Sequence, residues 1–349
     1  MPSPDTAEDS PPAQTQLTNT RERFIRAFRW MLVTRLLEER LRSLYHAGRI
    51  VGGVYIGRGQ EAFSTSSGVV LDRKKGDVFG PLIRDLGGRL AFGQPLLDHS
   101  RTYFGSAHGP MRGRDGNVHN GRPREGVPAM ISHLGSLTSV ICGMLFAKRF
   151  RGESGFAAVS SLGDGASSTG ACHEALNLAG IEKLPLVVAL ANNHYAYSTP
   201  TDRQFACKNL AERAVGYGFT GHTVDGTDLS ACLEVFSTAV AAARAGQGPQ
   251  LVVGSLLRLS GHGEHDDSSY ISEKHRAAAY GRDCMEVAVE QALAHSFATE
   301  EEIAAWKKEA ATQVADAIST AQKESGPDPY SETWRALATA HLADGFFDA

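Results

Sequence analysis

The segment LGDGASSTGACHEALNLAGIEKLPLVVALANN, residues 162–193, decides the fold class of this chain. An apolar run over Phe156–Leu162 leads into it, and residues 168–180 carry apolar side chains at helical spacing. A second apolar run follows over Pro185–Ala191. Two short apolar strands joined by a helix of this length are typical of parallel sheets, whose strands are buried on both faces. We therefore expect a parallel strand–helix–strand unit here.

The same alternation continues outward in both directions along the chain. Further predicted elements are helices over 21–47, 60–71, 208–217 and 229–245, strands over 219–224 and 251–257, and a short strand that runs into a loop over 77–85. Repeated strand–helix–strand units predict an α/β fold with a doubly wound, mainly parallel sheet that is flanked by helices.

The pattern divides the chain into one domain and two tails. Residues 1–20 are polar and rich in Pro, Ser, Thr and Asp, which predicts a disordered tail and not a secretory signal. Residues 21–325 form the α/β domain with helical extensions, one of which should begin at Thr299, and residues 326–349 form a C-terminal tail. Residues 105–128 lack apolar periodicity and predict a long loop, a feature that is often functional.

Composition narrows the functional class. The chain has 349 residues, 42% hydrophobic and 21% charged, and a net charge of −4, as expected for a globular protein without a basic bias towards nucleic acid or anionic membranes. The apolar stretch Phe28–Val33 is too short to span a bilayer. The five cysteines form no C-x-x-C pair, so we expect a reducing compartment, the cytoplasm.

Polar side chains follow both central strands at the sheet edge where ligands gather in α/β folds. Gly163-Asp164-Gly165 ends the first strand, and its glycines and the following helix N-terminus suit a phosphate. Asn193 ends the next strand, beyond the 26 intervening residues 166–191 and Asn192. Oxygens from Asp164, Asn193, a main-chain carbonyl and a diphosphate form the ligand set that Mg²⁺ prefers.

Gly-Asp-Gly, 26 residues and Asn-Asn together form the thiamine diphosphate–magnesium motif. With its surroundings the chain resembles the α subunits of the thiamine diphosphate-dependent, decarboxylating component of 2-oxo acid dehydrogenase complexes. The resemblance covers roughly residues 22–325, which implies that the α/β domain is the thiamine diphosphate-binding domain. Further matching stretches are HEALN (173–177), LAERAVGYGFTGHTVDGTDL (210–229) and RLSGHGEHDDSSY (258–270), and more loosely GRGQEA (57–62) and IRDLG (83–87).

The resemblance implies a role for each matching position. Asp164, Asn193 and the main-chain carbonyl of Tyr195 would bind Mg²⁺. Arg84 matches the family arginine that grips the diphosphate, a task that suits a permanently charged, forked guanidinium. His262 matches the active-site histidine on a mobile loop, where an imidazole can contact cofactor and substrate and move protons. The other cofactor-binding positions are Ser132 and Leu134, on the aminopyrimidine side, and the backbones of Gly163 and Gly165.

The activity that the resemblance implies is oxidative decarboxylation of a 2-oxo acid, either pyruvate or a branched-chain acid. The acyl group would pass to a lipoyl-bearing acyltransferase, with thiamine diphosphate and Mg²⁺ as cofactors. In two-chain members of the family, the glutamate that activates the cofactor lies on a β subunit. We therefore expect half an enzyme, completed by a β chain in an α2β2 heterotetramer.

Three positions depart from the family pattern. Ile83 stands where a tyrosine commonly precedes the diphosphate arginine, and Ala191 stands where a polar or charged residue often precedes the asparagines. Both departures bear on cofactor affinity. Gly263 stands where some mitochondrial relatives carry a regulatory phosphoserine, so that control cannot operate at this position.

Other functions stay open on the sequence. An acetoin dehydrogenase α subunit or a single-chain decarboxylase shares the motif, and a non-catalytic nucleotide-binding protein could reuse the fold. The last is disfavoured because the chain pairs Asp164 with Asn193 and lacks G-x-G-x-x-G after the strand. The sequence does not identify the 2-oxo acid, the β chain or the acyltransferase core, and it does not say which of His108, His119 and His133 contacts the substrate.

Overall fold

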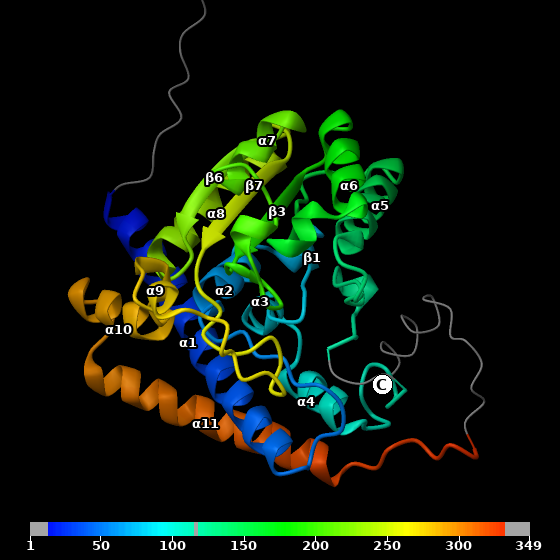
Figure 1. Cartoon of the computed structure of the whole chain (residues 1–349), viewed down its shortest axis with the longest axis vertical. Coiled ribbons are helices and arrows are strands. Elements are labelled where there is room, and N and C mark those ends of the chain that lie inside the picture. Colours follow the sequence, from blue (N-terminus) through cyan, green and yellow to red (C-terminus); the bar gives the residue numbers. More distant parts are fainter. Residues whose placement is uncertain (1–12, 115–117, 332–349) are drawn as a thin grey trace, which may run out of the picture.

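The centre of the molecule is a parallel sheet. The computed structural model describes residues 13–114 and 118–331. Within that part of the chain, five strands form the sheet and all four neighbouring pairs are parallel (Figure 1). In spatial order they are β1 (Val78–Gly80), β2 (Ala158–Gly163), β3 (Leu186–Asn192), β7 (Gln250–Ser255) and β6 (Thr220–Asp225). The predicted α/β fold with a parallel sheet is confirmed.

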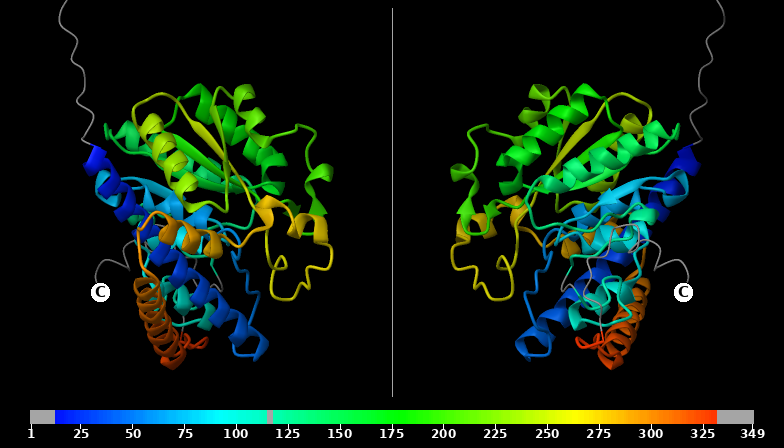
Figure 2. Two further views of the ribbon diagram at one scale, coloured as in Figure 1. Left: turned by 90° about the vertical axis from the view of Figure 1, so that its left-hand side faces the viewer. Right: turned by 90° about the vertical axis from the view of Figure 1, so that its right-hand side faces the viewer.

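Helices cover both faces of the sheet (Figures 1 and 2). On β3, Val188 and Leu190 face one hydrophobic cluster and Val187 and Ala189 face another. The first cluster includes α5 (Ser136–Phe150) and α6 (Gly170–Ile181), and the second includes α2 (Glu61–Val69) and α8 (Leu229–Arg244). Burial on both faces explains why the strand is apolar throughout and does not alternate with polar residues.

A third layer of helices lies beyond α2. The long α1 (Ala13–His46) packs against α11 (Glu300–Lys323), and a cluster that includes Phe24, Phe28 and Met31 is buried there (Figure 2). Helix α11 begins as predicted, because Thr299 forms a capping box with Glu302. The other helices of this layer are α3 (Leu86–Phe92), α4 (Leu96–Phe104) and α10 (Cys284–Ala294).

Short elements complete the described chain. They are α7 (Arg213–Gly216), α9 (Glu273–Arg276), the two-stranded β4 (Tyr195–Ala196) and β5 (Thr199–Pro200), and the 3-10 helices η1 (Arg73–Lys75), η2 (Pro123–Glu125), η3 (Gly165–Ser168), η4 (Thr201–Arg203), η5 (Leu210–Glu212) and η6 (Ala279–Gly281). The predicted long loop holds only η2 and turns among its described residues.

Three expectations about the elements need correction. The prediction of a disordered tail over residues 1–20 is wrong for residues 13–20, because α1 begins at Ala13. Once a helix has formed, each residue added at its end gains one hydrogen bond, so α1 extends into this polar segment. Residues 1–12 and 332–349 lie outside the described residues. The helix predicted over 208–217 is only η5 and α7, and Gly218, at φ 71°, follows it. Helices α3, α4 and α5 were not predicted, because a mostly apolar stretch such as 136–150 shows no clear helical period.

Two negative observations concern the described residues. Within them, no helix is both long enough and apolar enough to cross a membrane. The five cysteines, all of which lie in this part of the chain, are unpaired.

A buried carboxyl group supports the segment between α1 and α2. Glu38 is 3% exposed, and its Oε2 accepts the main-chain N–H of Gly57 at 2.9 Å. Burial, and next the charge of Glu61, raise the pKa of Glu38 to about 8. At neutral pH the folded protein therefore holds a proton on Glu38 that an exposed glutamate would have lost.

The raised pKa of Glu38 predicts how stability depends on pH. Because the folded protein keeps this proton between pH 4.5 and about 8 and the unfolded chain does not, the stability from Glu38 falls as pH rises through that range. The slope for one group is at most about 1.4 kcal/mol per pH unit. Glu38→Gln keeps an acceptor for Gly57, and we expect denaturant unfolding at pH 5 to 8 to show a flatter pH profile for the variant. Identical profiles would contradict this account.

Candidate active site

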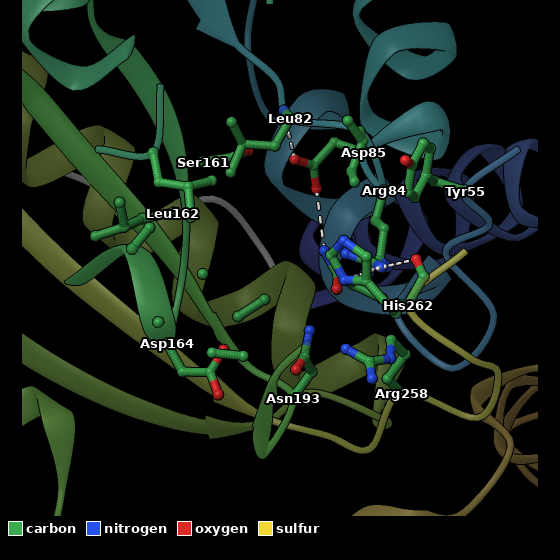
Figure 3. A pocket seen from close by; sticks show the side chains of 18 of the residues that line it. Tyr55, Leu82, Arg84, Asp85, Ser161, Leu162, Asp164, Asn193, Arg258 and His262 are labelled. Carbon is green, nitrogen blue, oxygen red and sulfur yellow. Dashed lines mark hydrogen bonds between the residues drawn. The ribbon is translucent and has the colours of Figure 1, made fainter. Parts of the chain in front are cut away.

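One cavity of about 570 Å³ lies at the carboxyl ends of β2 and β3. Its walls come from six stretches of the chain: the α1–α2 connection, the segment after β1, the segment before α5, the end of β2, the end of β3 and the chain after β7. Figure 3 labels residues from all of these stretches except the one before α5. All nine residues singled out from the sequence line it: Arg84, Ser132, Leu134, Gly163, Asp164, Gly165, Asn193, Tyr195 and His262.

The pairing of β2 with β3 brings two buried oxygen donors together. Gly163 is paired with Ala191, so Asp164, one residue after Gly163, and Asn193, two residues after Ala191, emerge at the same edge, 2% and 6% exposed (Figure 3). Asp164 Oδ2 accepts a hydrogen bond from Gln204 Nε2 at 3.2 Å, and burial raises the pKa of Asp164. A buried carboxylate beside a cavity is stabilised by a cation, so this edge fits a bound metal ion.

The two glycines around Asp164 do different work. A Cβ on Gly163 would meet nothing within 4 Å, so the backbone there borders open space in the cavity. A Cβ on Gly165 would lie 2.5 Å from Cβ of Ala196, so only glycine lets the segment after β3 approach this closely. The result is an open cradle beside Asp164 that could hold a phosphate.

Arg84 reaches the cavity from the segment after β1. Its Nη2 donates to the main-chain carbonyl of His262, while its Nε is buried without a hydrogen-bond partner among the described residues. Burial, and next the charge of Arg258, lower the pKa of Arg84 to about 10, so it stays charged at neutral pH. A charged, unsatisfied N–H at the wall of a cavity fits an anionic ligand such as a diphosphate.

His262 is held between two aromatic rings. Its ring centroid lies 5.5 Å from that of Tyr55 and 4.5 Å from that of Tyr197. Burial, and next the charges of Arg84 and Arg258, lower the pKa of His262 to about 4, so the imidazole is neutral at pH 7. Nδ1 lies 3.4 Å from the Nη2 donor of Arg84, which makes Nδ1 the acceptor and assigns the proton to Nε2.

Arg258 is a cavity residue that sequence reasoning missed. It is 2% exposed, and it donates to the carbonyls of Tyr195 at 3.1 Å, Tyr197 at 2.7 Å and Ser260 at 3.1 Å. It thereby ties the segment after β3 to the segment that carries His262. The Tyr195 carbonyl keeps a second lone pair for a metal ion. The available signal was an arginine directly after the apolar run Leu256–Leu257.

The remaining predicted residues lie towards the outside. Leu134 is 57% exposed and Ser132 is also exposed, so they form the mouth of the cavity. Of the three histidines left open by the sequence, only His119 lines the cavity, where its Nε2 lies 2.5 Å from Ser132 Oγ. Ile83 and Ala191 also line it and present apolar surface where relatives often present polar groups.

Comparisons with known proteins agree with this geometry. Residues 29–330 match the family described as the dehydrogenase E1 component. The α subunit of acetoin:2,6-dichlorophenolindophenol oxidoreductase from Cupriavidus necator is 31% identical over 88% of this chain and 92% of its own length. The 2-oxoisovalerate dehydrogenase subunit alpha of Bacillus subtilis is 35% identical over 70% of this chain and 73% of its own. The pyruvate dehydrogenase E1 component subunit alpha of Rhizobium meliloti is 30% identical over 88% of each chain.

These relatives are α subunits of pyruvate, branched-chain 2-oxo acid and acetoin enzymes, and the name α subunit implies a β chain in each of them. The family implies thiamine diphosphate as the cofactor, and the phosphate cradle, the buried Asp164 and the unsatisfied Arg84 fit its diphosphate. The match spans most of the chain, and the resemblance drawn from the sequence is confirmed. This chain belongs to the dehydrogenase E1 component family, among its α subunits.

Proposed function

We propose that this chain is the α subunit of a thiamine diphosphate- and Mg²⁺-dependent 2-oxo acid dehydrogenase. The substrate is pyruvate or a branched-chain 2-oxo acid, and the acyl group passes to a lipoyl-bearing acyltransferase. The observation that carries the proposal is the convergence of Asp164, Asn193, Arg84 and His262 on one cavity at the strand ends. When bound, the cofactor supplies a thiazolium ring that accepts the electrons released as CO₂ leaves.

The strand-end residues bind the charged end of the cofactor. Asp164, Asn193 and the Tyr195 carbonyl hold Mg²⁺, a hard cation that prefers such oxygen donors. Arg84 donates its free Nε–H to the diphosphate, and the Gly163 backbone leaves room for it. Since Ile83 and Ala191 add no polar contact, Arg84 provides a larger share of diphosphate binding here than in relatives with polar residues at those positions.

His262 serves the substrate as a neutral hydrogen-bond donor. Its Nδ1 faces Arg84, so Nε2–H is free to donate to the carbonyl or carboxylate oxygen of a 2-oxo acid. The rings of Tyr55 and Tyr197 restrict the imidazole to one orientation. A donor that is already in place costs no reorganisation during the reaction.

A β chain is needed to complete the site. None of the described residues that line the cavity is a glutamate, although the cofactor needs one to be activated. The exposed Leu134 at the mouth also favours cover by a second chain. We propose an α2β2 heterotetramer with the cofactor at the α–β interface, in a reducing compartment such as the cytoplasm, which suits the unpaired cysteines.

An acetoin dehydrogenase α subunit is the second candidate function. It is favoured by the extent of the similarity to the Cupriavidus necator protein, which covers 92% of that protein. The two candidates share the cofactor and the partner and differ in the substrate that the completed pocket accepts.

Removal of the metal-side charge should weaken cofactor binding. For Asp164→Asn we expect thiamine diphosphate affinity in the presence of Mg²⁺, measured by calorimetry, to fall by at least roughly tenfold, because one anionic ligand is lost. The control Asp202→Asn changes an exposed aspartate of a nearby segment and should bind normally. Unchanged affinity in Asp164→Asn would rule out the assigned metal site.

Loss of the His262 imidazole should separate catalysis from cofactor binding. We expect His262→Asn to lower kcat of the enzyme assembled with its β chain by about 10²- to 10⁴-fold, with thiamine diphosphate affinity almost unchanged. The exposed His265 gives the control His265→Asn, which should keep near-normal kcat. Because the pKa of His262 is lowered to about 4, its titration should leave no inflection in the wild-type activity between pH 5 and 8.

Reconstitution tests the half-enzyme proposal directly. The chain is assayed alone and with its β chain for reduction of an artificial electron acceptor, with thiamine diphosphate, Mg²⁺ and pyruvate, branched-chain 2-oxo acids or acetoin. We expect activity only with both chains, and the preferred substrate then separates the two candidates. Activity of the single chain would refute the need for a β chain, and an inactive, folded complex that binds a nucleotide would favour a non-catalytic role.

A further inference from the structure

The chain after β7 forms a compact loop that carries His262, here called the histidine loop (residues 258–270). Figure 2 shows it in yellow, projecting beyond the carboxyl end of the sheet. Asp266 organises it internally, since its Oδ2 accepts the N–H of His262 and the hydroxyl of Tyr270, both at 2.5 Å. Although burial raises the pKa of Asp266, these hydrogen bonds lower it to about 2, so the carboxylate stays charged. Internal order alone does not fix the loop against the cavity.

Glu264 connects the histidine loop to the body of the protein. Its Oε2 lies 3.0 Å from Arg42 Nε and 3.1 Å from His46 Nε2. These two partners are four residues apart at the end of α1 and therefore lie on one face of that helix. The side chain of Glu264 is 6% exposed, whereas those of Arg42 and His46 are 48% and 54% exposed. The carboxylate is thus covered by its two partners, and its main-chain N–H also donates to Val54 at 2.9 Å.

Gly263, the neighbour of Glu264, packs against Tyr55, and Tyr55 in turn contacts the imidazole of His262. A Cβ on Gly263 would lie 2.8 Å from Cε1 of His265 and 3.0 Å from Cε1 of Tyr55, so the loop backbone packs closely against both rings at this glycine. The Tyr55 ring meets the edge of His262. Any outward movement of the loop would separate His262 from Tyr55. Anchoring at Glu264 and placement of His262 are therefore linked through Tyr55 and Gly263.

We propose that Glu264 is a positioning residue, whose ion pair with Arg42 and hydrogen bond with His46 hold the histidine loop closed so that His262 stays at the cavity. The consequence for catalysis rests on the proposed role of His262; the anchoring does not. Gly263 has no side chain that could be modified. The adjacent residue, Glu264, supplies the contact that keeps the loop ordered. Loss of the Glu264 charge leaves the Asp266 hydrogen bonds in place, so the loop should keep its internal structure and open more often.

Hydrogen exchange on the full-length chain measures the anchoring without any assay of activity. For Glu264→Gln, which keeps the size and removes the charge, we expect amides 259–266 to exchange roughly five- to thirtyfold faster, as local opening becomes more frequent. The matched control is Asp267→Asn, an exposed carboxylate of the same loop that bonds only to Ser269 within the described residues. It should exchange like the wild type.

A double-mutant cycle assigns the effect to the ion pair. Arg42→Gln alone should accelerate exchange, and adding it to Glu264→Gln should accelerate exchange little further, because Glu264→Gln already removes the interaction that Arg42 makes. Fully additive effects, or wild-type exchange in Glu264→Gln, would overturn the anchoring.

The kinetic readout tests positioning. In the enzyme assembled with its β chain, kcat of Glu264→Gln should fall in proportion to the fraction of the histidine loop that stays closed, as given by the exchange protection, while thiamine diphosphate affinity stays within about threefold. An unchanged kcat in a variant whose amides 259–266 have lost their protection would overturn the positioning role. An inactive wild-type complex would instead count against the proposed function, and the exchange experiment would still decide whether Glu264 anchors the loop.

Discussion

The parallel pairing of β2 with β3 is the constraint on which the site depends. Because Gly163 and Ala191 are neighbours in the sheet, the residues that follow them leave it at the same edge, and Asp164 and Asn193 meet without any adjustment of side chains. The pairing is stabilised by apolar side chains on both faces of the strands, buried under α5 and α6 on one side and α2 and α8 on the other. The position of two oxygen donors is therefore set by the hydrophobic core of the fold.

Buried ion pairs position the wall of the cavity that the α1–α2 connection forms. Arg35 on α1 pairs with Glu61 at 2.6 Å and with Asp283 at 2.9 Å, and Glu61 also accepts the N–H of Gly59 at 2.8 Å. Together with the protonated Glu38, which accepts the N–H of Gly57, these charged groups fix the α1–α2 connection. The N–H of Leu259 then donates to the carbonyl of Arg58, at the start of the histidine loop. The charged groups of the helical layer thus hold in place the α1–α2 connection, to which the loop that carries His262 is hydrogen-bonded.

The two halves meet through arginines. Arg84 joins the segment after β1 to the carbonyl of His262, and Arg258 joins the carbonyls of Tyr195 and Tyr197 to the histidine loop. Burial of His262, and next the charges of these two guanidiniums, lower its pKa, which keeps the imidazole neutral. One consequence of this arrangement is that the edge with Asp164 and Asn193 and the wall with His262 share the same positive charges, so an anionic cofactor would change the surroundings of His262 as well.

The sequence by itself determined the fold class, the strand order along the chain around residues 156–193 and the identity of Asp164, Asn193, Arg84 and His262 as cavity residues. The fold class and the pair Asp164 and Asn193 were open to it because buried strands are continuous apolar runs and because the Gly-Asp-Gly and Asn-Asn motifs belong to one strand–helix–strand unit. Arg84 and His262 were assigned by the family resemblance of the stretches around them. Arg258, Tyr55, Glu38 and Glu264 stayed hidden, as did α5. Their contacts join residues that are distant in the chain, such as Glu264 with Arg42, and no local pattern encodes such a contact. Only the tertiary structure decides them, since the buried or exposed state of a charge depends on which helix packs over it.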